Sequence, residues 1–274
     1  MKRRNNPRIA GCLLALGLTG LAPIAAQAQA QPMSDTWQFE LAIYGWFPAI
    51  SGSTAFPSTG NSGPYIDVSS SDVISALKMV FMGQAEARKG QWGVWTDLVY
   101  ADLGGSKSAS RDYTVGGRPV NATANLGLDV KSTVWTLAGL YNVSSMPENT
   151  TDLLFGARML NMKQTLNWEL SNSIPQLPGR SGEASADETD WDAIVGIKGR
   201  YYLGADRRWF LPYYADLGGG QSKFTWQVNA GVGYRFDWGS TFLTYRYLDY
   251  EFKSGNLVQS LTLSGALLGV AFQF

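Results

Sequence analysis

The most constraining feature of this chain is residues 223–236, KFTWQVNAGVGYRF, in which polar and apolar side chains alternate without exception. Every even-numbered position from Phe224 to Phe236 is apolar, and every odd-numbered position from Thr225 to Arg235 is polar or glycine. Successive side chains of an extended chain point to opposite faces, so this segment predicts a strand with one apolar and one polar face. A tilted strand crosses a bilayer in about 9–11 residues, and this run is long enough to do so.

The last residues of the chain repeat the same design. Residues 231–236 (GVGYRF) and 269–274 (GVAFQF) share the pattern Gly-Val-small-aromatic-polar-Phe, and the second copy ends at Phe274. A chain that stops on an aromatic residue inside a two-faced strand resembles bacterial outer-membrane β-barrels, whose terminal Phe helps the barrel-assembly machinery recognise them. The resemblance implies that Phe272 and Phe274 form an assembly signal.

The N-terminal segment has the layout of a cleaved secretory signal. Its basic residues come first: Lys2, Arg3, Arg4 and Arg8. An apolar run over 9–26 and Ala-x-Ala sites at 26–28 and 28–30 follow. This layout predicts a signal peptide over 1–30 and one mature domain over 31–274. A membrane anchor is the alternative, but the apolar run is short and is interrupted by Gly and Pro. Cys12 precedes most of that run instead of following it, which argues against lipidation.

The composition narrows the class of protein. The chain has 22 Lys and Arg against 22 Asp and Glu, and removing the four basic residues of the signal leaves 18 against 22, a net charge of −4. Nothing in this balance indicates nucleic-acid binding. The only cysteine lies in the signal, so the mature chain has no disulfide. After the signal, no segment approaches the roughly 18 consecutive apolar residues of a membrane helix, which leaves a β-barrel as the way to cross a bilayer.

Alternation along the mature chain predicts an all-β, up-and-down antiparallel barrel of about ten transmembrane strands. The expected strands are 36–47, 77–89, 92–103, 128–143, 153–166, 191–203, 209–217, 223–236, 241–252 and 257–274. The bulky apolar face of each strand is assigned to lipid. A secreted lipocalin-like barrel, with the apolar face turned inward, is the alternative.

The links between these strands differ in length. Three long links, 49–76, 104–127 and 167–190, are rich in Gly, Ser, Asn and Thr, whereas the links after even-numbered strands are shorter. Bacterial barrels have short periplasmic turns and longer outer loops, so both termini are predicted to be periplasmic. The hexapeptide YADLGG occurs at 100–105 and at 214–219, by duplication of a hairpin or by independent use of the same rim chemistry.

Several segments resemble a group of poorly characterised proteobacterial outer-membrane β-barrel proteins. They are YGWFPAISG at 44–52, FMGQAEARKG at 81–90, WDAIVG at 191–196, ADLGG at 215–219 and TYRYL at 244–248. The resemblance covers nearly the whole mature chain. It implies the fold and the outer-membrane location, and it brings no activity or catalytic residues.

Charged residues on the polar faces are expected inside the barrel, because Arg or Lys facing lipid costs about 2–4 kcal/mol near the midplane. The expected lumen set is Glu40, Glu86, Arg88, Asp97, Asp129, Lys131, Arg158, Asp192, Lys198, Arg200, Arg235 and Arg246. Five acids and seven bases are close to balance, which predicts ion pairs that fill a narrow interior. A conducting pore or a ligand site lined by the same residues is the alternative.

No enzymatic activity is predicted. The chain has no histidine, which removes the usual general base and leaves no His or Cys ligands for zinc in the mature chain. An acidic run near the rim could hold a divalent ion: Glu183, Asp187, Glu188, Asp190 and Asp192. Its spacing matches no calcium-loop template, so a solvated loop and no metal site are expected.

The sequence therefore predicts a monomeric outer-membrane barrel with a structural or narrow-channel role and without a cofactor. Its expected partners are outer-membrane lipid, lipopolysaccharide and the barrel-assembly machinery, and nucleic acid is not among them. A small-solute porin is one alternative function. Surface binding or adhesion through the long loops is another.

Overall fold

A computed structural model describes residues 35–54, 65–115, 118–146, 148–172, 180–254 and 258–274. The predicted signal segment 1–30 lies outside these residues. Within them, no helix has the length and apolar character needed to span a membrane.

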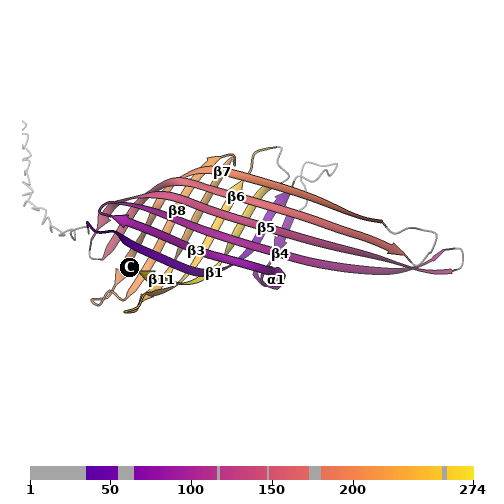
Figure 1. Ribbon diagram of the computed structural model, residues 1–274, viewed down its shortest axis with the longest axis horizontal. Coiled ribbons are helices and arrows are strands. Elements are labelled where there is room, and N and C mark those ends of the chain that lie inside the picture. The colour runs from indigo at the N-terminus through magenta and orange to yellow at the C-terminus, as the bar shows by residue number, and fades with distance from the viewer. Residues whose placement is uncertain (1–34, 55–64, 116–117, 147, 173–179, 255–257) are drawn as a thin grey trace, which may run out of the picture.

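The described chain forms one antiparallel sheet that closes on itself (Figure 1). Its strands are β1 (Gln38–Thr54), β2 (Tyr65–Val68), β3 (Leu77–Lys89), β4 (Trp92–Val115), β5 (Arg118–Ser145), β6 (Asn149–Asn172), β7 (Arg180–Leu203), β8 (Trp209–Gly220), β9 (Phe224–Arg235), β10 (Ser240–Glu251) and β11 (Val258–Gln273). Of these 11 strands, the four-residue β2 pairs only with one part of β1, so ten strands make the wall. The predicted ten-stranded barrel is confirmed.

The barrel closes between the first and last strands. β1 pairs with β11 from Glu40↔Gln273 to Thr54↔Val258. Beyond the ladder, Phe39 N donates to Phe274 O at 3.1 Å and Phe274 N donates to Phe39 O at 3.0 Å. Both chain ends of the described barrel therefore lie at one end, here called the terminal end, and the opposite end is called the loop end.

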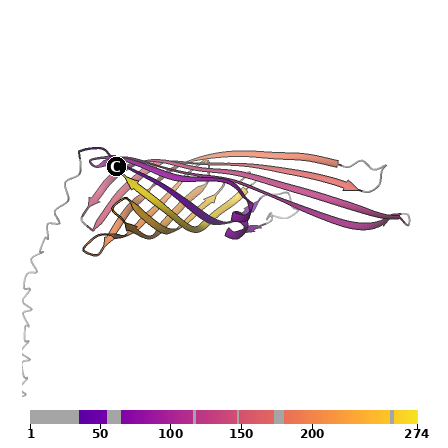
Figure 2. The same ribbon diagram turned by 60° about the horizontal axis from the view of Figure 1, so that its bottom comes forward.

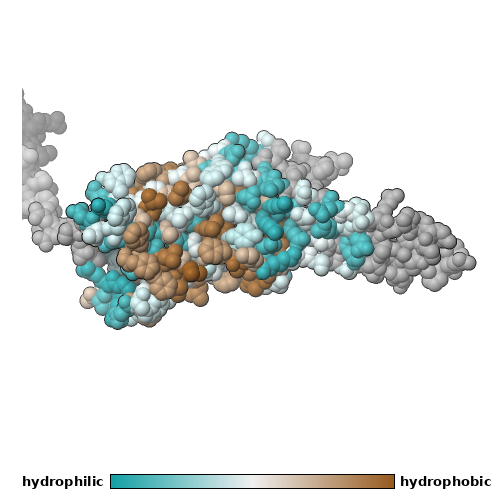
Figure 3. All heavy atoms as spheres, viewed as in Figure 1, coloured by the Kyte–Doolittle hydropathy of each residue, from teal (hydrophilic) through white to brown (hydrophobic). Residues whose placement is uncertain are grey.

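Side chains sort between the two faces as the alternation predicts. On β9, Phe224, Val228 and Val232 are 42%, 40% and 37% exposed, whereas Thr225 and Gln227 are buried in the lumen. On the face that Figure 3 shows, apolar residues gather across the middle of the barrel, with hydrophilic residues towards either end. The lipocalin-like alternative, which needs the apolar face inside, is wrong for this structure.

Aromatic side chains edge the apolar band. Near the terminal end, Trp209 contacts Tyr234 with ring centroids 5.0 Å apart. Further along the strands, Trp135 and Trp191 meet edge to face at 5.9 Å between centroids. Aromatic girdles of this kind occur at both interfaces of membrane barrels, because one end of the ring system prefers the polar headgroups.

The links at the terminal end are short. β3 and β4 are joined by only Gly90 and Gln91, and Gly90 has a φ of +59°. A two-residue hairpin turn requires a left-handed conformation that glycine adopts without steric cost, which explains this residue at the turn.

At the loop end, four strands continue past the others. β4 to β7 are 24, 28, 24 and 24 residues long, and they project as a four-stranded sheet (Figure 2). Most of 104–127 and 167–190, predicted as loops, is therefore strand, and that prediction is wrong. Both faces of these segments lie beyond the apolar band, so neither face needs apolar side chains. The strands continue through backbone pairing, and the sequence there shows no hydrophobic alternation.

The other predicted long loop, 49–76, contains short regular elements. β1 continues through Thr54 and pairs with β2, and α1 (Ser70–Ala76) follows. Ser69 caps this helix, since its Oγ accepts a hydrogen bond from Asp72 N at 3.3 Å. Val73 is the buried residue of α1.

Introducing arginine at either of two neighbouring positions on β9 tests the assignment of the faces. Val228→Arg puts a charge on the lipid-facing side and should lower the free energy of unfolding by roughly 2–4 kcal/mol. Asn229→Arg, one position along, enters the lumen and should cost less. Urea titrations of folding into lipid bilayers measure both, and equal losses or the opposite order would contradict the assignment.

Candidate functional site

The lumen holds the polar and charged side chains that the barrel removes from lipid. They fall into a network at the terminal end, two buried arginine clusters in the middle, and an apolar cluster towards the loop end.

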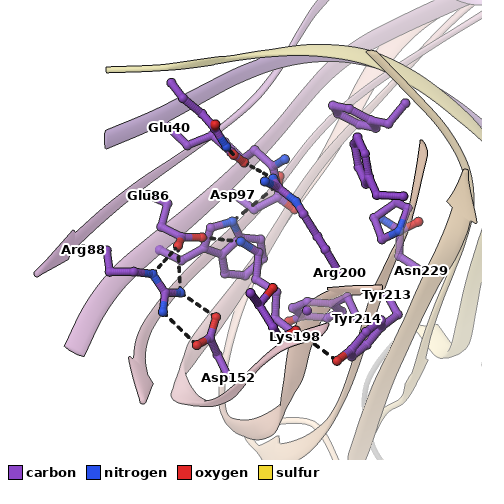
Figure 4. Close-up of a pocket in the computed structure, with 18 of the residues that line it drawn as sticks. Glu40, Glu86, Arg88, Asp97, Asp152, Lys198, Arg200, Tyr213, Tyr214 and Asn229 are labelled. Atoms are coloured by element: carbon purple, nitrogen blue, oxygen red, sulfur yellow. Dashed lines mark hydrogen bonds and ion pairs between the residues drawn. The ribbon is translucent and has the colours of Figure 1, made fainter. Parts of the chain in front are cut away.

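The terminal network connects four strands (Figure 4). Arg88 on β3 donates from Nε to Glu86 Oε1 at 3.1 Å and from Nη1 to Asp152 Oδ1 at 2.8 Å. Lys198 on β7 donates to the other oxygen of Glu86. Arg200, also on β7, pairs with Glu40 across the lumen, where β1 begins. These ion pairs brace opposite walls of the barrel.

The first buried cluster is centred on Arg246 of β10, which is 2% exposed. Its Nη1 lies 2.8 Å from Asp97 Oδ2, and its Nε donates to Gln227 Oε1 at 3.0 Å. Tyr44 donates its hydroxyl hydrogen to the other oxygen of Asp97. The guanidinium also stacks on Trp46, 4.6 Å from the ring centroid, so it is satisfied on its edge and its face.

The second buried cluster is centred on Arg158 of β6. Its guanidinium pairs with Asp216 of β8, and both side chains are 0% exposed. Weaker contacts of 3.4 Å join Arg158 to Thr136 Oγ1, Thr225 Oγ1 and the Tyr214 hydroxyl. A charge so completely buried is stable only with its counter-ion in place.

Apolar side chains also fill part of the lumen, most of them on the loop-end side of Arg246, although Tyr44 and Leu267 line the terminal cavity. The buried members are Tyr44, Trp46, Met82, Val99, Val134, Leu160, Leu248, Tyr250, Phe252, Leu261, Leu263 and Leu267. They come from β1, β3 to β6, and β10 to β11, and they pack as one contiguous cluster. On the β7 side of the lumen at this level, the buried side chains include the polar residues Asp190, Asp192 and Ser222.

The terminal part of the lumen is not filled. A cavity of about 590 Å³ is lined by the terminal network and by Asp97 and Arg246 at its inner end. Rim residues Gln38, Gly90 and Phe274 also line it, so the cavity reaches the terminal end of the barrel.

Most of the predicted lumen residues lie where the sequence put them. Glu40, Glu86, Arg88, Asp97, Lys198, Arg200 and Arg246 line the cavity. Arg158 is buried in the middle of the barrel. Asp192 is also buried, and it accepts hydrogen bonds from the Ser222 backbone at 2.9 Å and from its hydroxyl. Arg235 lies at the terminal mouth, 5.8 Å from the ring centroid of Tyr202.

The inward placement of Asp129 and Lys131 is wrong. On β5 they alternate in step with Leu137, which is 44% exposed on the outer face. Asp129 pairs with Lys78, and Lys131 Nζ lies 3.3 Å from Asp102 Oδ2. Because β5 continues beyond the apolar band, a charge can face outward there without entering lipid.

Sequence reasoning missed two acids that pair with arginines in the lumen. Asp152 was assigned to a link, although it begins the inward alternation of β6 that continues to Arg158. Asp216 lies in the second copy of the YADLGG hexapeptide, and its counterpart in the first copy is Asp102. The two copies face opposite ways: Asp216 is in the lumen with Arg158, and Asp102 is on the outside with Lys131.

The acidic run near the rim is split by the strand that carries it. On β7, Asp187 lies on the outer side, where Asn161 Nδ2 donates to it at 2.9 Å, whereas Asp190 and Asp192 are buried on the inner side. Partial burial and the nearby Asp190 raise the pKa of Glu188 above its usual value. Among the described residues, no three His, Cys, Asp or Glu side chains are grouped so as to hold a metal ion.

Comparison with known proteins identifies the fold. No family model and no curated protein sequence matches this chain. Among solved structures, the outer membrane protease OmpT from Escherichia coli is similar over 90% of this chain and 100% of its own length, with a TM-score of 0.50 and 10% identity.

Two further structures are less similar. The translocator domain of the autotransporter NalP from Neisseria meningitidis gives a TM-score of 0.38 at 16% identity, covering 87% of this chain and 89% of that domain. The attachment invasion locus protein Ail of Yersinia pestis gives 0.31 at 12% identity, covering 87% and 98%. The likeness to OmpT shows that this chain has the fold of a bacterial outer-membrane β-barrel, which supports an outer-membrane location.

Substitutions at the Arg158–Asp216 pair test whether the middle of the lumen is dry. Asp216→Asn leaves a buried guanidinium without its counter-ion and should cost about 3–5 kcal/mol of unfolding free energy. Arg158→Met combined with Asp216→Leu replaces the pair by apolar side chains and should recover most of that loss. Denaturant titration in detergent micelles measures each variant.

The exposed pair Lys223–Glu251, whose side chains are 63% and 50% exposed, provides the matched control. Glu251→Gln should cost less than about 1 kcal/mol, because water screens a surface pair. A similarly small loss for Asp216→Asn would mean that water reaches the middle of the lumen.

Proposed function

We propose that this protein is a closed outer-membrane barrel with a structural role, whose lumen does not conduct ions. The observation that supports this most directly is the sequence of fillings along the lumen. The Arg246 and Arg158 clusters take up the middle, and the apolar cluster takes up the loop-end side. Because a solvated ion needs a continuous hydrated path, hydrocarbon from β1, β3 to β6, β10 and β11, together with the buried ion pairs of the two arginine clusters, opposes conduction.

The barrel is oriented in this proposal with the terminal end in the periplasm. The short links at the terminal end and the long hairpins β4–β5 and β6–β7 at the other end favour this orientation, since bacterial barrels have short periplasmic turns. The predicted signal peptide over 1–30 exports the chain, and the mature protein is a monomer surrounded by outer-membrane lipid and lipopolysaccharide. Membership of the poorly characterised proteobacterial group that the sequence resembles is part of the same proposal.

No catalytic role is included. The name of OmpT describes a protease, but a likeness at 10% identity extends only to the fold. The chain has no histidine to act as a general base at neutral pH. Each carboxylate that lines the cavity is held in an ion pair with a cation, so none of them is free to act on a substrate without breaking a pair.

The projecting sheet favours a second role at the cell surface. Strands β4 to β7 continue well past the apolar band and present backbone and side chains beyond the membrane, on a rigid support (Figure 2). Function in barrels is often carried by such external segments.

Planar-bilayer recording tests the closed lumen. Wild-type protein should insert without stable current steps. Trp46→Ala combined with Leu248→Ala removes side chains from the apolar cluster and should admit current. Leu243→Ala with Tyr245→Ala, on the lipid face of the strand that carries Leu248, should not. A wild type that passes steady current, with an ion selectivity that Glu86→Gln alters, would make a narrow porin the better account.

Removing Phe274 tests the proposed assembly signal. Its backbone makes two hydrogen bonds to Phe39 at the seam, while its ring is largely exposed, so recognition by another protein and seam closure are separable. Phe274→Ala keeps the backbone bonds and should still lower the amount of folded, heat-modifiable barrel in the outer membrane without changing export across the inner membrane. Purified Phe274→Ala should refold in detergent as well as wild type does. Normal assembly of this variant in cells would contradict the proposed assembly signal.

A further inference from the structure

The cavity at the terminal end has the size of a small-molecule site. Its volume is about 590 Å³, within the 300–1,000 Å³ typical of ligand pockets. It extends from the rim at Gly90 and Phe274 inward to Arg246, so a solute can enter it from the terminal end. The closed-lumen proposal does not use this space.

The charges that line the cavity balance each other. Its acids are Glu40, Glu86, Asp97 and Asp152, and its bases are Arg88, Lys198, Arg200 and Arg246, which gives four against four. Every one of these acids is in an ion pair with one of these bases. A charged ligand would have to break a pair or enter without a counter-ion, so the cavity favours a neutral one.

The polar atoms that lack partners are all oxygens. Among the described residues, five buried side-chain N or O atoms have no hydrogen-bond partner, and three of them belong to residues lining this cavity: Asn142 Oδ1, Asn229 Oδ1 and Thr244 Oγ1. Asn142 and Thr244 are only 4% and 5% exposed. Asn142 Nδ2 donates to Asp152 Oδ1 at 2.8 Å, which fixes the amide with its oxygen free. These oxygens have almost no exposed area in this structure, so a ligand reaches them only when the side chains turn slightly towards it. Buried acceptors without partners are costly, and a ligand with several hydroxyl donors would satisfy them after this adjustment.

Aromatic rings supply the remaining surface. Trp95 and Tyr214 lie with ring centroids 5.3 Å apart and both line the cavity, as do Tyr202 and Phe210. In Figure 4, Tyr214 lies opposite the wall that carries Glu86 and Arg88. An aromatic face gains dispersion energy from the C–H face of a sugar ring, while amide and hydroxyl groups bind its edge.

From these four properties we propose that the terminal cavity binds a neutral mono- or disaccharide. The hydroxyl groups of the sugar donate to Asn142, Asn229 and Thr244, and its ring packs against the aromatic wall. The ion pairs stay intact, and they also accept or donate hydrogen bonds at the edge of the ligand. An ordered group of waters is the competing occupant.

Calorimetric titration of the folded barrel tests this proposal. The detergent must have no sugar headgroup, because a maltoside would compete. The probes are glucose, N-acetylglucosamine, cellobiose and di-N-acetylchitobiose, with glucuronate and glucosamine as charged analogues of the monosaccharides. At least one neutral sugar should bind with a Kd of about 1 mM or below, and its charged analogue should bind about tenfold more weakly or not at all.

Two variants connect binding to the unpartnered oxygens. Thr244→Val removes a hydroxyl that bonds to nothing in the protein, so it should fold normally and weaken sugar binding about tenfold. Asn229→Ala should do the same and serves if Thr244→Val fails to fold. Thr241→Val, three positions away on the outer face of β10, is the matched control and should bind as wild type does.

The result that overturns the proposal is the absence of any sugar-dependent heat with correctly folded wild type, as expected if water alone fills the cavity. Binding that is unchanged in both Thr244→Val and Asn229→Ala would also overturn it. Neither result bears on ion conductance, so the closed-lumen proposal stands or fails separately.

Discussion

The structure depends on one constraint, that a backbone in hydrocarbon has no water with which to hydrogen bond. Every peptide group in the membrane must then be paired within the chain, and a sheet meets this demand only when its two edges join. Here the joining seam is the ladder between β1 and β11, completed by the reciprocal bonds of Phe39 and Phe274. Two other features serve the same closed sheet. The alternation of β9 puts one face of the strand towards lipid, and the two-residue link at Gly90 lets the chain return across the bilayer as the neighbouring antiparallel strand.

Closure creates a second problem inside, because the inward face of each strand must be filled. The chain fills it in two ways. Apolar side chains around Trp46 and Leu248 pack towards the loop end, and arginines with their acids occupy the middle. The arginines join strands that are distant in sequence, as Arg158 joins β6 to β8, so they fix the shape of the cross-section as well as its polarity. At the terminal end, paired charges line the wall without filling the space, and the cavity remains.

The sequence predicts the parts of the fold that lipid enforces. Val228 and Thr225 were assigned to opposite faces because a membrane strand leaves no freedom in this respect, and the structure confirms the assignment. The projecting halves of β4 to β7 were not predicted, because water on both sides removes the apolar pattern. Lys131 shows the limit of the rule, since the argument that charges face inward holds only within the band. The partner of Arg158 could not be predicted, because 58 residues separate it from Asp216 and barrel curvature brings them together.

The projecting sheet differs from the barrel at its edges, which are formed by β4 and β7. The pairing of β4 with β3 stops at Leu103, and the pairing of β7 with β8 begins at Asp192. Beyond these residues, neither β4 nor β7 has a ladder partner on that side within the described chain. The molecule therefore combines a sheet without edges inside the membrane and a sheet with two open edges outside it. The first cannot be extended, whereas the second offers two rows of peptide groups to which a further strand can be added by backbone hydrogen bonds alone.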